Sequence, residues 1–305
     1  MTRDFLFTSE SVTDGHPDKL CDQISDAIVD RYLQQDPFSS IVAETAVSRG
    51  IIFIAVHLSS KGSVDIPGLA REVIRDIGYE DESFNERSCS IMTSLNEVPP
   101  SEDLLRDERE LDDDALDGLV VNENATLFGF ACNQTEELLP LPIVLAHDLA
   151  RTLAEVRRDG SLPYLEPDGQ TQVGIEYKNN RPHRIHSITL LASQSKDGPG
   201  LSRLRSDLMD RVVGSVFASR EIRPDDQTQV LINPEGAVLI GGPRFHSGST
   251  GRKTSVDTWG EYARSSGSAM SGKDPTRIDR IGVYAARYAA KNVVAAGLAD
   301  ECEVQ

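Results

Sequence analysis

The chain alternates between stretches in which apolar residues recur every three to four positions and short runs that are continuously apolar. The first spacing is that of one face of a helix. In the first such stretch Leu20, Ile24 and Ile28 share a face. Pro17 suits the first helical turn, and Asp36 precedes a proline that stops the helix. Helices are expected over residues 17–34, 66–77, 141–157, 200–217 and 279–297.

The continuous apolar runs are short and predict strands. Residues 41–47 and 51–58 are joined around Arg49-Gly50, and their unbroken apolarity favours burial on both faces. Because pairs of strands followed by helices recur, the pattern predicts an α+β fold of mixed sheets packed with helices. Further strands are expected at residues 172–177, 185–192, 229–232 and 237–240.

The composition of the chain limits the kinds of partner that it can bind. The 305 residues carry a net charge of −18 at pH 7, which repels nucleic acid and anionic membranes, so neither partner is expected. An ATP enzyme with this charge must gather its basic residues locally. No apolar run is long enough to span a bilayer, and the N-terminus lacks the order of a signal peptide. The cysteines form no CxxC pair and indicate free thiols in a reducing, cytoplasmic setting.

Residues 101–118 (SEDLLRDERELDDDALDG) are strongly acidic and have no clear period. They are interpreted as a solvated loop or a connection between domains, since runs of like charge are most often exposed. A role in magnesium binding stays open, although the spacing gives it no support.

Three motifs carry candidate chemistry. The first, SESVTDGHPDK, places His16, Asp18 and Lys19 at a predicted helix start, where free N–H groups and a partial positive charge favour anions. In this reading Asp18 holds Mg²⁺ while His16 and Lys19 face phosphate oxygens. The alternative is a capped helix with surface charges, and composition alone leaves both open.

The second motif is GSTGRK at 248–253, in which small residues let the backbone approach an anion and adjacent cations supply charge. The third is SGKDPTRIDR at 271–280. Gly267 to Lys273 fits G-x-x-x-x-G-K, but Asp274 replaces the Ser or Thr that binds magnesium, and polar residues precede it. The P-loop interpretation is therefore rejected.

The order and spacing of these blocks resemble the S-adenosylmethionine synthetase family. The resemblance is carried by FTSESVTDGHPDKLCDQISDAI, GFACNQTEELLPLPI, GSLPYLEPDGQ, STGRK with VDTWG, and SGKDPTRIDR with YAARYAAKNVVAAGLAD. It covers essentially the whole chain. It implies an α+β fold of three similar small domains, each a mixed sheet packed with helices. The domains are expected at 1–100, 118–235 and 236–305, the third incomplete because the family continues past a segment like CEVQ.

The resemblance also implies an activity. Family members form S-adenosylmethionine from ATP and methionine and release phosphate and pyrophosphate. The methionine sulfur attacks the 5′ carbon of ATP and expels triphosphate, which the same site then cleaves. The family uses Mg²⁺ and K⁺ and forms homodimers, often paired into tetramers, with active sites at the subunit interface. The same state, at least a homodimer, is expected for this chain.

Site residues are carried over by motif match alone. The resemblance implies catalytic roles for His16, Lys19, Arg252 and Lys273. It implies nucleotide contacts from the same four residues and from Asp168, Lys253 and Ala269. It implies Mg²⁺ ligation by Asp18 and Asp279 and K⁺ ligation by Glu44.

The acceptor pocket departs from the family pattern. His57 stands where the family has a glutamate that pairs with the methionine ammonium, and Val98 stands for a glutamine. Losing one charge-assisted hydrogen bond costs roughly 1.5–3 kcal/mol. Gln170 also replaces a phosphate-binding lysine. The residues expected around the acceptor are His57, Val98, Glu123, His246 and Arg277, the last keeping the charge of a family lysine and His246 replacing an aspartate.

Three functions therefore stay open. The first is a methionine adenosyltransferase with an altered pocket. The second is a divergent paralogue in which another nucleophile, or water, attacks the same carbon. The third is a non-catalytic ATP-binding partner subunit, a hypothesis based on Gln170, Val238 and the expected incomplete third domain.

Overall fold

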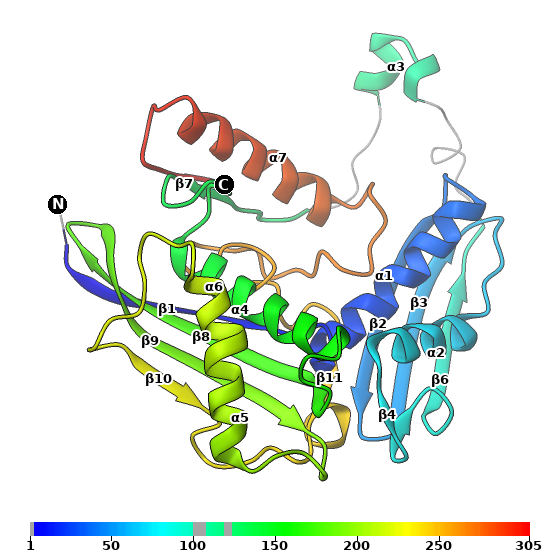
Figure 1. The fold of residues 1–305 in the computed structure, drawn as a ribbon. Helices are drawn as coiled ribbons and strands as arrows, with labels where there is room; N and C mark the ends of the chain where they lie inside the picture. The colour runs from blue at the N-terminus through cyan, green and yellow to red at the C-terminus, as the bar shows by residue number, and fades with distance from the viewer. Residues whose placement is uncertain (1–2, 100–107, 119–123) are drawn as a thin grey trace.

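The computed structural model describes residues 3–99, 108–118 and 124–305 (Figure 1). It confirms the α+β prediction: two mixed sheets, each with helices on one face, lie beside a smaller unit of two strands and a helix. Among the described residues no helix has the length and apolarity needed to cross a membrane.

One mixed sheet has the strand order β11-β2-β3-β6. Its strands are β2 (Ser40–Ser48), β3 (Ile51–Ser59), β6 (Ser90–Glu97) and the short β11 (Gly248–Ser249). β2 and β3 are antiparallel, whereas β6 runs parallel to β3. Helices α1 (Pro17–Gln35) and α2 (Ile66–Ile77) cover one face, where Leu20, Ile24 and Ile28 pack against Ile52 and Ile54. On the other face Ile51, Phe53 and Met92 are exposed, and no helix or strand of the described residues covers them.

The second mixed sheet has the order β1-β8-β9-β10. It contains β1 (Phe5–Val12), β8 (Leu165–Lys178), β9 (Arg181–Gln194) and β10 (Gln229–Ile232). Helix α4 (Leu141–Arg158) and the helical stretch α5 (Leu201–Leu208), η3 (Met209–Val213) and α6 (Gly214–Phe217) cover it (Figure 1).

A third unit pairs β7 (Gly129–Cys132) with β12 (Glu301–Val304) as antiparallel strands under α7 (Ile278–Ala295). Small elements complete the described chain: β4 (Glu80–Asp81), β5 (Phe84–Asn85) and η4 (Gly242–Arg244). Strand pairing crosses the expected domain ranges, because β1 joins the central sheet and β11 joins the N-terminal one. The division at 1–100, 118–235 and 236–305 stays a prediction.

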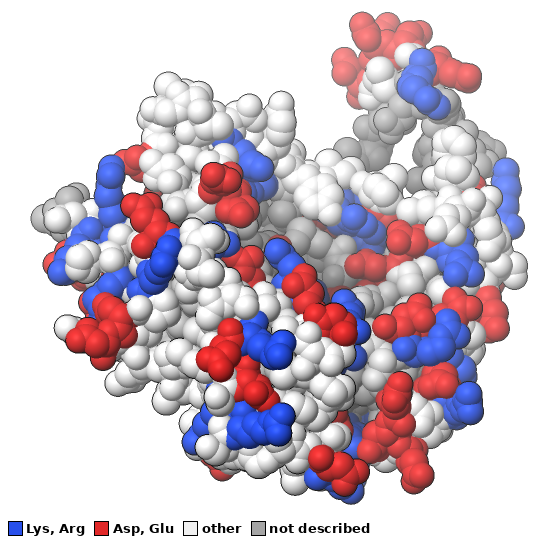
Figure 2. All heavy atoms as spheres, in the orientation of Figure 1, with Lys and Arg blue, Asp and Glu red and all other residues white. Residues whose placement is uncertain are grey.

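Two predictions of secondary structure are wrong. The acidic segment, expected as a solvated loop or a connection between domains, is exposed as expected, but its described part contains η2 (Glu108–Glu110) and α3 (Asp113–Asp117). The Asp112 side chain accepts a hydrogen bond from the Ala115 N–H, and Asp113 and Asp114 suit the positive end of the helix. Figure 2 shows these acidic side chains crowded on a projection of the surface.

The second error concerns residues 237–240, which were expected to pair with 229–232 as a strand. β10 instead runs parallel to β9, and Val238 forms only an isolated bridge to Ser193. Asn233 explains the change: its side-chain amide exchanges hydrogen bonds with the backbone N–H and C=O of Ala192, both at 2.9 Å. The turn therefore directs the chain along β9, and no hairpin forms.

Candidate active site

The predicted anion site begins where β1 passes into α1. His16 is the N-cap of α1, and its Nδ1 accepts a hydrogen bond from the Asp18 N–H at 3.2 Å. Pro17 occupies the first turn, as the sequence predicted. Burial lowers the pKa of His16 to about 4, against the opposing charges of Asp168 and Asp18. The ring is therefore neutral at pH 7.

An acidic stripe on α1 docks the two glycine-rich loops. Asp18, Asp22 and Asp26 recur every four residues and so share one helix face. Their carboxylates accept hydrogen bonds from the backbone N–H groups of Ser249 at 3.0 Å, Gly251 at 2.8 Å and Gly272 at 2.7 Å, respectively. The helix thereby fixes both loops relative to His16.

Glycine is required where the loops meet the helix and its neighbours. Gly251 and Gly272 have φ values of +76° and +71°, in the left-handed region that disfavours side chains. A Cβ at Gly251 would lie 2.3 Å from that of Ala269, and one at Gly272 would lie 2.0 Å from the Ala43 carbonyl oxygen. Ala269, a predicted nucleotide contact, therefore lies directly beside the GSTGRK loop.

The basic residues near His16, which we call the His16 group, are paired with carboxylates. Lys19 Nζ donates to Asp257 at 2.7 Å and to Asp22 at 3.1 Å. Burial opposes the charge of Lys19, but the two carboxylates outweigh it and raise the pKa. Arg252 lies 3.5 Å from the Asp18 carboxylate, and half of its side chain is exposed. A cavity of about 430 Å³ adjoins Lys19 and Asp257.

Lys253 and Gln170 share one carboxylate. Lys253 Nζ donates to Glu10 Oε1 at 2.6 Å, and Gln170 Nε2 donates to Glu10 Oε2 at 2.7 Å. Glu10 therefore neutralises the charge of Lys253 and holds its side chain in position when no anionic ligand is bound. Gln170, predicted to stand for a family lysine, adds a donor here but no charge.

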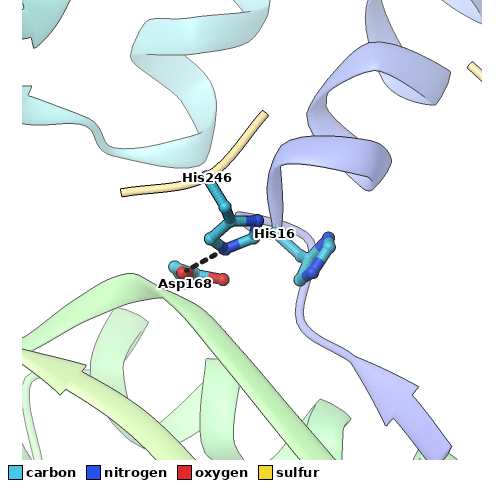
Figure 3. Close-up of side chains that lie close together, drawn as sticks. All are labelled: His16, Asp168 and His246. Atoms are coloured by element: carbon cyan, nitrogen blue, oxygen red, sulfur yellow. Dashed lines mark hydrogen bonds and ion pairs between the residues drawn. The ribbon is translucent and has the colours of Figure 1, made fainter. Parts of the chain in front are cut away.

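Asp168 and His246 form a pair beside His16 (Figure 3). His246 Nε2 lies 3.2 Å from Asp168 Oδ2. The centroids of the His16 and His246 imidazole rings are 4.8 Å apart. The hydrogen bond to Asp168 raises the pKa of His246, against the effect of burial. Asp168 is itself fixed, because its Oδ2 also accepts the Gly242 N–H at 2.7 Å. Predicted nucleotide and acceptor residues thus meet here.

The remaining basic residues form a second group at the edge of β2. Lys273 bridges to Val42 on that strand, and its Nζ donates to Asp279 Oδ2 at 2.5 Å. Arg277 donates to the Ser40 hydroxyl at 3.3 Å. The predicted Mg²⁺ ligand Asp279 and the predicted phosphate ligand Lys273 therefore neutralise each other within this group.

The predicted K⁺ ligand Glu44 and the predicted acceptor residue His57 lie on the sheet face opposite α1 and α2. Glu44 on β2 and His57 on β3 are exposed, and His57 Nδ1 lies 3.0 Å from Asn96 Nδ2 on β6. Val98 follows β6, and its N–H donates to the Leu58 carbonyl. Glu123 lies outside the described residues.

Sequence reasoning missed four acids of the site, namely Glu10, Asp22, Asp26 and Asp257. Asp22 and Asp26 had a visible signal, since their spacing from Asp18 places all three on one face of a predicted helix. Glu10 and Asp257 had none, because each meets its lysine across more than 230 residues of chain. Glu10 and Asp257 hold the Lys253 and Lys19 side chains in position when no anionic ligand is bound.

The fold and the site define a class: an α+β protein whose candidate site gathers cations and acids from distant segments around one helix start. Residues 4–100 match the S-adenosylmethionine synthetase N-terminal domain, residues 119–238 its central domain and residues 240–305 its C-terminal domain. The chain belongs to the S-adenosylmethionine synthetase family. The resemblance drawn from its motifs is confirmed.

Curated relatives agree over the whole chain. The S-adenosylmethionine synthase of Gloeothece citriformis is 48% identical, over 100% of this chain and 76% of its own length. That of Gloeobacter violaceus is 48% identical over 99% of this chain and 76% of its own length. The synthase of Trichormus variabilis is 47% identical, with 100% and 76% covered.

Proposed function

We propose that this protein is a methionine adenosyltransferase, which joins ATP and methionine into S-adenosylmethionine and releases phosphate and pyrophosphate. The observation that carries the proposal is the docking of the GSTGRK loop on α1, through Asp18 and Asp22, beside His16. Membership of the S-adenosylmethionine synthetase family and the names of the relatives support the same activity.

Catalysis in this reaction consists mainly of stabilising a highly charged leaving group. Arg252 and Lys253 would bind triphosphate oxygens, because preorganised cations in a partly buried site favour the charge that develops there. On binding, Lys253 would replace its contact with Glu10 by one with a phosphate oxygen, and Lys19 would do the same with its contact to Asp257. His16, neutral at pH 7, would donate a hydrogen bond from its Nε2, since its Nδ1 is already an acceptor.

The donor set fits magnesium. Asp18 uses one carboxylate oxygen for the Ser249 N–H and has a second oxygen to offer, and Asp279 likewise uses one oxygen for Lys273. Carboxylate oxygens are the ligands that Mg²⁺ prefers. When bound, Mg²⁺ would neutralise polyphosphate charge. Glu44 fits K⁺ only as one oxygen donor among several, because it is a single exposed carboxylate on a sheet face.

A homodimer with active sites at the subunit interface belongs to the proposal. The uncovered sheet face presents Ile51, Phe53 and Met92, each more than two-fifths exposed, next to Glu44 and His57. Apolar side chains gathered on one face of a sheet are the usual signature of a protein interface. We infer that the partner subunit packs on this face. Pairing of dimers into a tetramer belongs to the same proposal.

Recognition of the acceptor is the part of the reaction that these residues support least. An ammonium is best met by a carboxylate, whereas neither His57 nor Val98 has one and His246 is already paired with Asp168. This observation favours a second candidate, in which another nucleophile or water attacks the same carbon.

The test is product analysis. Purified protein is incubated with ATP, Mg²⁺ and K⁺, with and without methionine, and products are identified by mass spectrometry. Methionine-dependent S-adenosylmethionine is expected. Adenosine formed without methionine, or a new adenosyl product, would favour the second candidate. ATP binding without turnover would contradict both and indicate a non-catalytic subunit.

A matched pair of variants ties the activity to the site. His16→Asn keeps an acceptor for the Asp18 N–H, since asparagine is a good N-cap, but removes the donor to phosphate. Turnover should fall by about a hundredfold or more. His183→Asn, on β9, is the control and should retain wild-type turnover.

A further inference from the structure

Two histidines and one aspartate converge beside α1. The ligand atoms of His16, Asp168 and His246 all lie within 4.8 Å of one another. Figure 3 shows them approaching from three separate segments: the start of α1, strand β8 and the loop after η4. We propose that these residues form a binding site for a divalent transition-metal ion of the Zn²⁺ type. The inference does not rest on the proposed function.

The donor types select the ion. Two imidazoles and a carboxylate suit Zn²⁺ and its first-row neighbours, whereas Mg²⁺ prefers oxygen ligands alone. In a tetrahedral site with bonds of about 2.0 Å, donor atoms lie about 3.3 Å apart. His246 Nε2 and Asp168 Oδ2 already lie 3.2 Å apart. The pair that lies furthest apart must close by at most roughly 1.5 Å, and His246, a third of whose side chain is exposed, has room to rotate.

The surroundings orient the carboxylate and support His16. Asp168 Oδ2 accepts the Gly242 N–H at 2.7 Å, and its backbone carbonyl accepts the Ser193 hydroxyl at 2.6 Å. When Nε2 of His16 ligates an ion, Nδ1 must carry the ring proton and release the Asp18 N–H that it accepts here. The Nδ1–H can then donate to Asp18 Oδ2, which lies 3.7 Å away, after a small rotation of the side chains. Metal-bound histidines usually have such a carboxylate partner.

The site differs from the magnesium ligands in composition and in consequence. Asp18 and Asp279 offer only oxygens, whereas this cluster offers two ring nitrogens. Nearby Lys253 and Arg252 repel a cation, and Asp168 and Asp18 offset them. His16 belongs both to this cluster and to the proposed triphosphate site. A metal ion held here would therefore occupy the position proposed for triphosphate, and the ion and triphosphate would exclude each other.

The experiment measures Zn²⁺ binding by the full chain without nucleotide. Chelator-treated protein is kept in millimolar Mg²⁺, which fills carboxylate-only sites on the acidic surface, and Zn²⁺ is titrated against a chromophoric chelator. One Zn²⁺ per chain is expected, with an affinity that falls at least about tenfold in His246→Asn. His186→Asn is the matched control, because His186 also pairs with a carboxylate, Glu176 at 3.3 Å, and should leave the affinity unchanged.

Co²⁺ gives a second readout. The bound ion should show the strong visible absorption of a four- or five-coordinate site with nitrogen ligands, and this absorption should weaken in His246→Asn. Equal Zn²⁺ affinity in wild type and variant, or the faint spectrum of six oxygen ligands, would overturn the proposal.

A second variant guards against a folding defect. Asp168→Asn keeps an acceptor oxygen for the Gly242 N–H but loses the charged ligand, and its Zn²⁺ affinity should fall by a similar factor. Variants are compared by thermal unfolding without metal. Because adenosyl transfer is assayed with Mg²⁺ and K⁺ alone, failure of this proposal leaves that result unaffected.

Discussion

The His16 group and the uncovered face of the β11-β2-β3-β6 sheet contrast in how their residues are held. In the first, each lysine already has a carboxylate partner, as Lys19 has Asp257 and Lys253 has Glu10. On the sheet face, Phe53 and Met92 are exposed, and no second layer covers them among the described residues. One region is organised within a single chain, whereas the other is suited to contact with a second subunit.

This difference indicates that anion binding depends on contacts within one chain, whereas the sheet face depends on a second subunit. A cation paired with an acid keeps its position before the ligand arrives, so a polyanion need only replace one partner by another. An exposed apolar face gains stability only when a second surface removes it from water. We therefore expect anion binding to be robust to changes at the sheet face, whereas turnover depends on both regions.

The largest effect is expected at the sheet face. Phe53→Glu removes apolar burial of roughly 1.5–3 kcal/mol per copy and sets like charges near each other, so the dimer dissociation constant should rise at least about a hundredfold. Sedimentation equilibrium measures it. Leu231→Glu, an exposed position on β10, is the control. A Phe53→Glu protein that remains dimeric would show that this face is not the interface.

The acidic stripe tests the other region. Asp22→Ala leaves the partly buried Gly251 N–H without its acceptor, at a cost of roughly 1–3 kcal/mol, and should lower kcat/KM about tenfold to a hundredfold. Asp22→Asn keeps an acceptor oxygen and should recover part of the loss in kcat/KM. Asp30→Ala, two turns further along the same helix and exposed, should retain wild-type kinetics. Equal losses in the alanine and asparagine variants would exclude a positioning role.

A smaller effect is expected at the acceptor pocket. His57→Glu places a carboxylate where the resemblance predicts one, and KM for methionine should fall about tenfold because a charge-assisted hydrogen bond becomes possible. KM for ATP should not change. His57→Gln adds no charge and serves as the control. If both variants change KM for methionine equally, charge at this position is not what the acceptor recognises.

The smallest effect concerns pH. Burial lowers the pKa of His147 below 6.5, with Asp257 and Asp148 opposing and Arg151 and Lys19 assisting. A depressed folded-state pKa contributes stability that is present above pH 6.5 and is lost as pH falls through the folded value. His147→Gln keeps a partner for the Ser11 hydroxyl but does not titrate.

The midpoint of thermal unfolding should therefore drop less between pH 7.5 and pH 5.5 in His147→Gln than in wild type, by on the order of 2 °C. Differential scanning calorimetry at both pH values measures it. Parallel drops in the two proteins would mean that His147 is not the titrating group.

Much of the fold could be predicted because its strongest signals are local. Apolar spacing located α1, α2, α4 and α7 and the strands β2 and β3. β1 was missed as a strand, since its polar residues Thr8, Ser9 and Glu10 are typical of a loop until they pair with β8. The helix at Asp113–Asp117 was missed because its stability comes from a cap and the helix dipole, and its residues lack an apolar face.

The candidate site divides in the same way. The helix start and the two glycine-rich loops were identified from residue types and their order alone. Their mutual positions were not, because the hydrogen bonds from Ser249, Gly251 and Gly272 to α1 join segments more than 220 residues apart. No sequence period records such a contact.

By itself, the sequence of this protein determined its helices, its buried strands, its family and the residue types that face a polyanion. These follow from local spacing and from motifs that each occupy a few adjacent positions. Only the tertiary structure decided that His246 meets His16 and Asp168, that Glu10 holds Lys253, and that Glu44 and His57 lie on an uncovered face. Those facts depend on how sheets and helices pack, and packing joins residues that are distant in the chain.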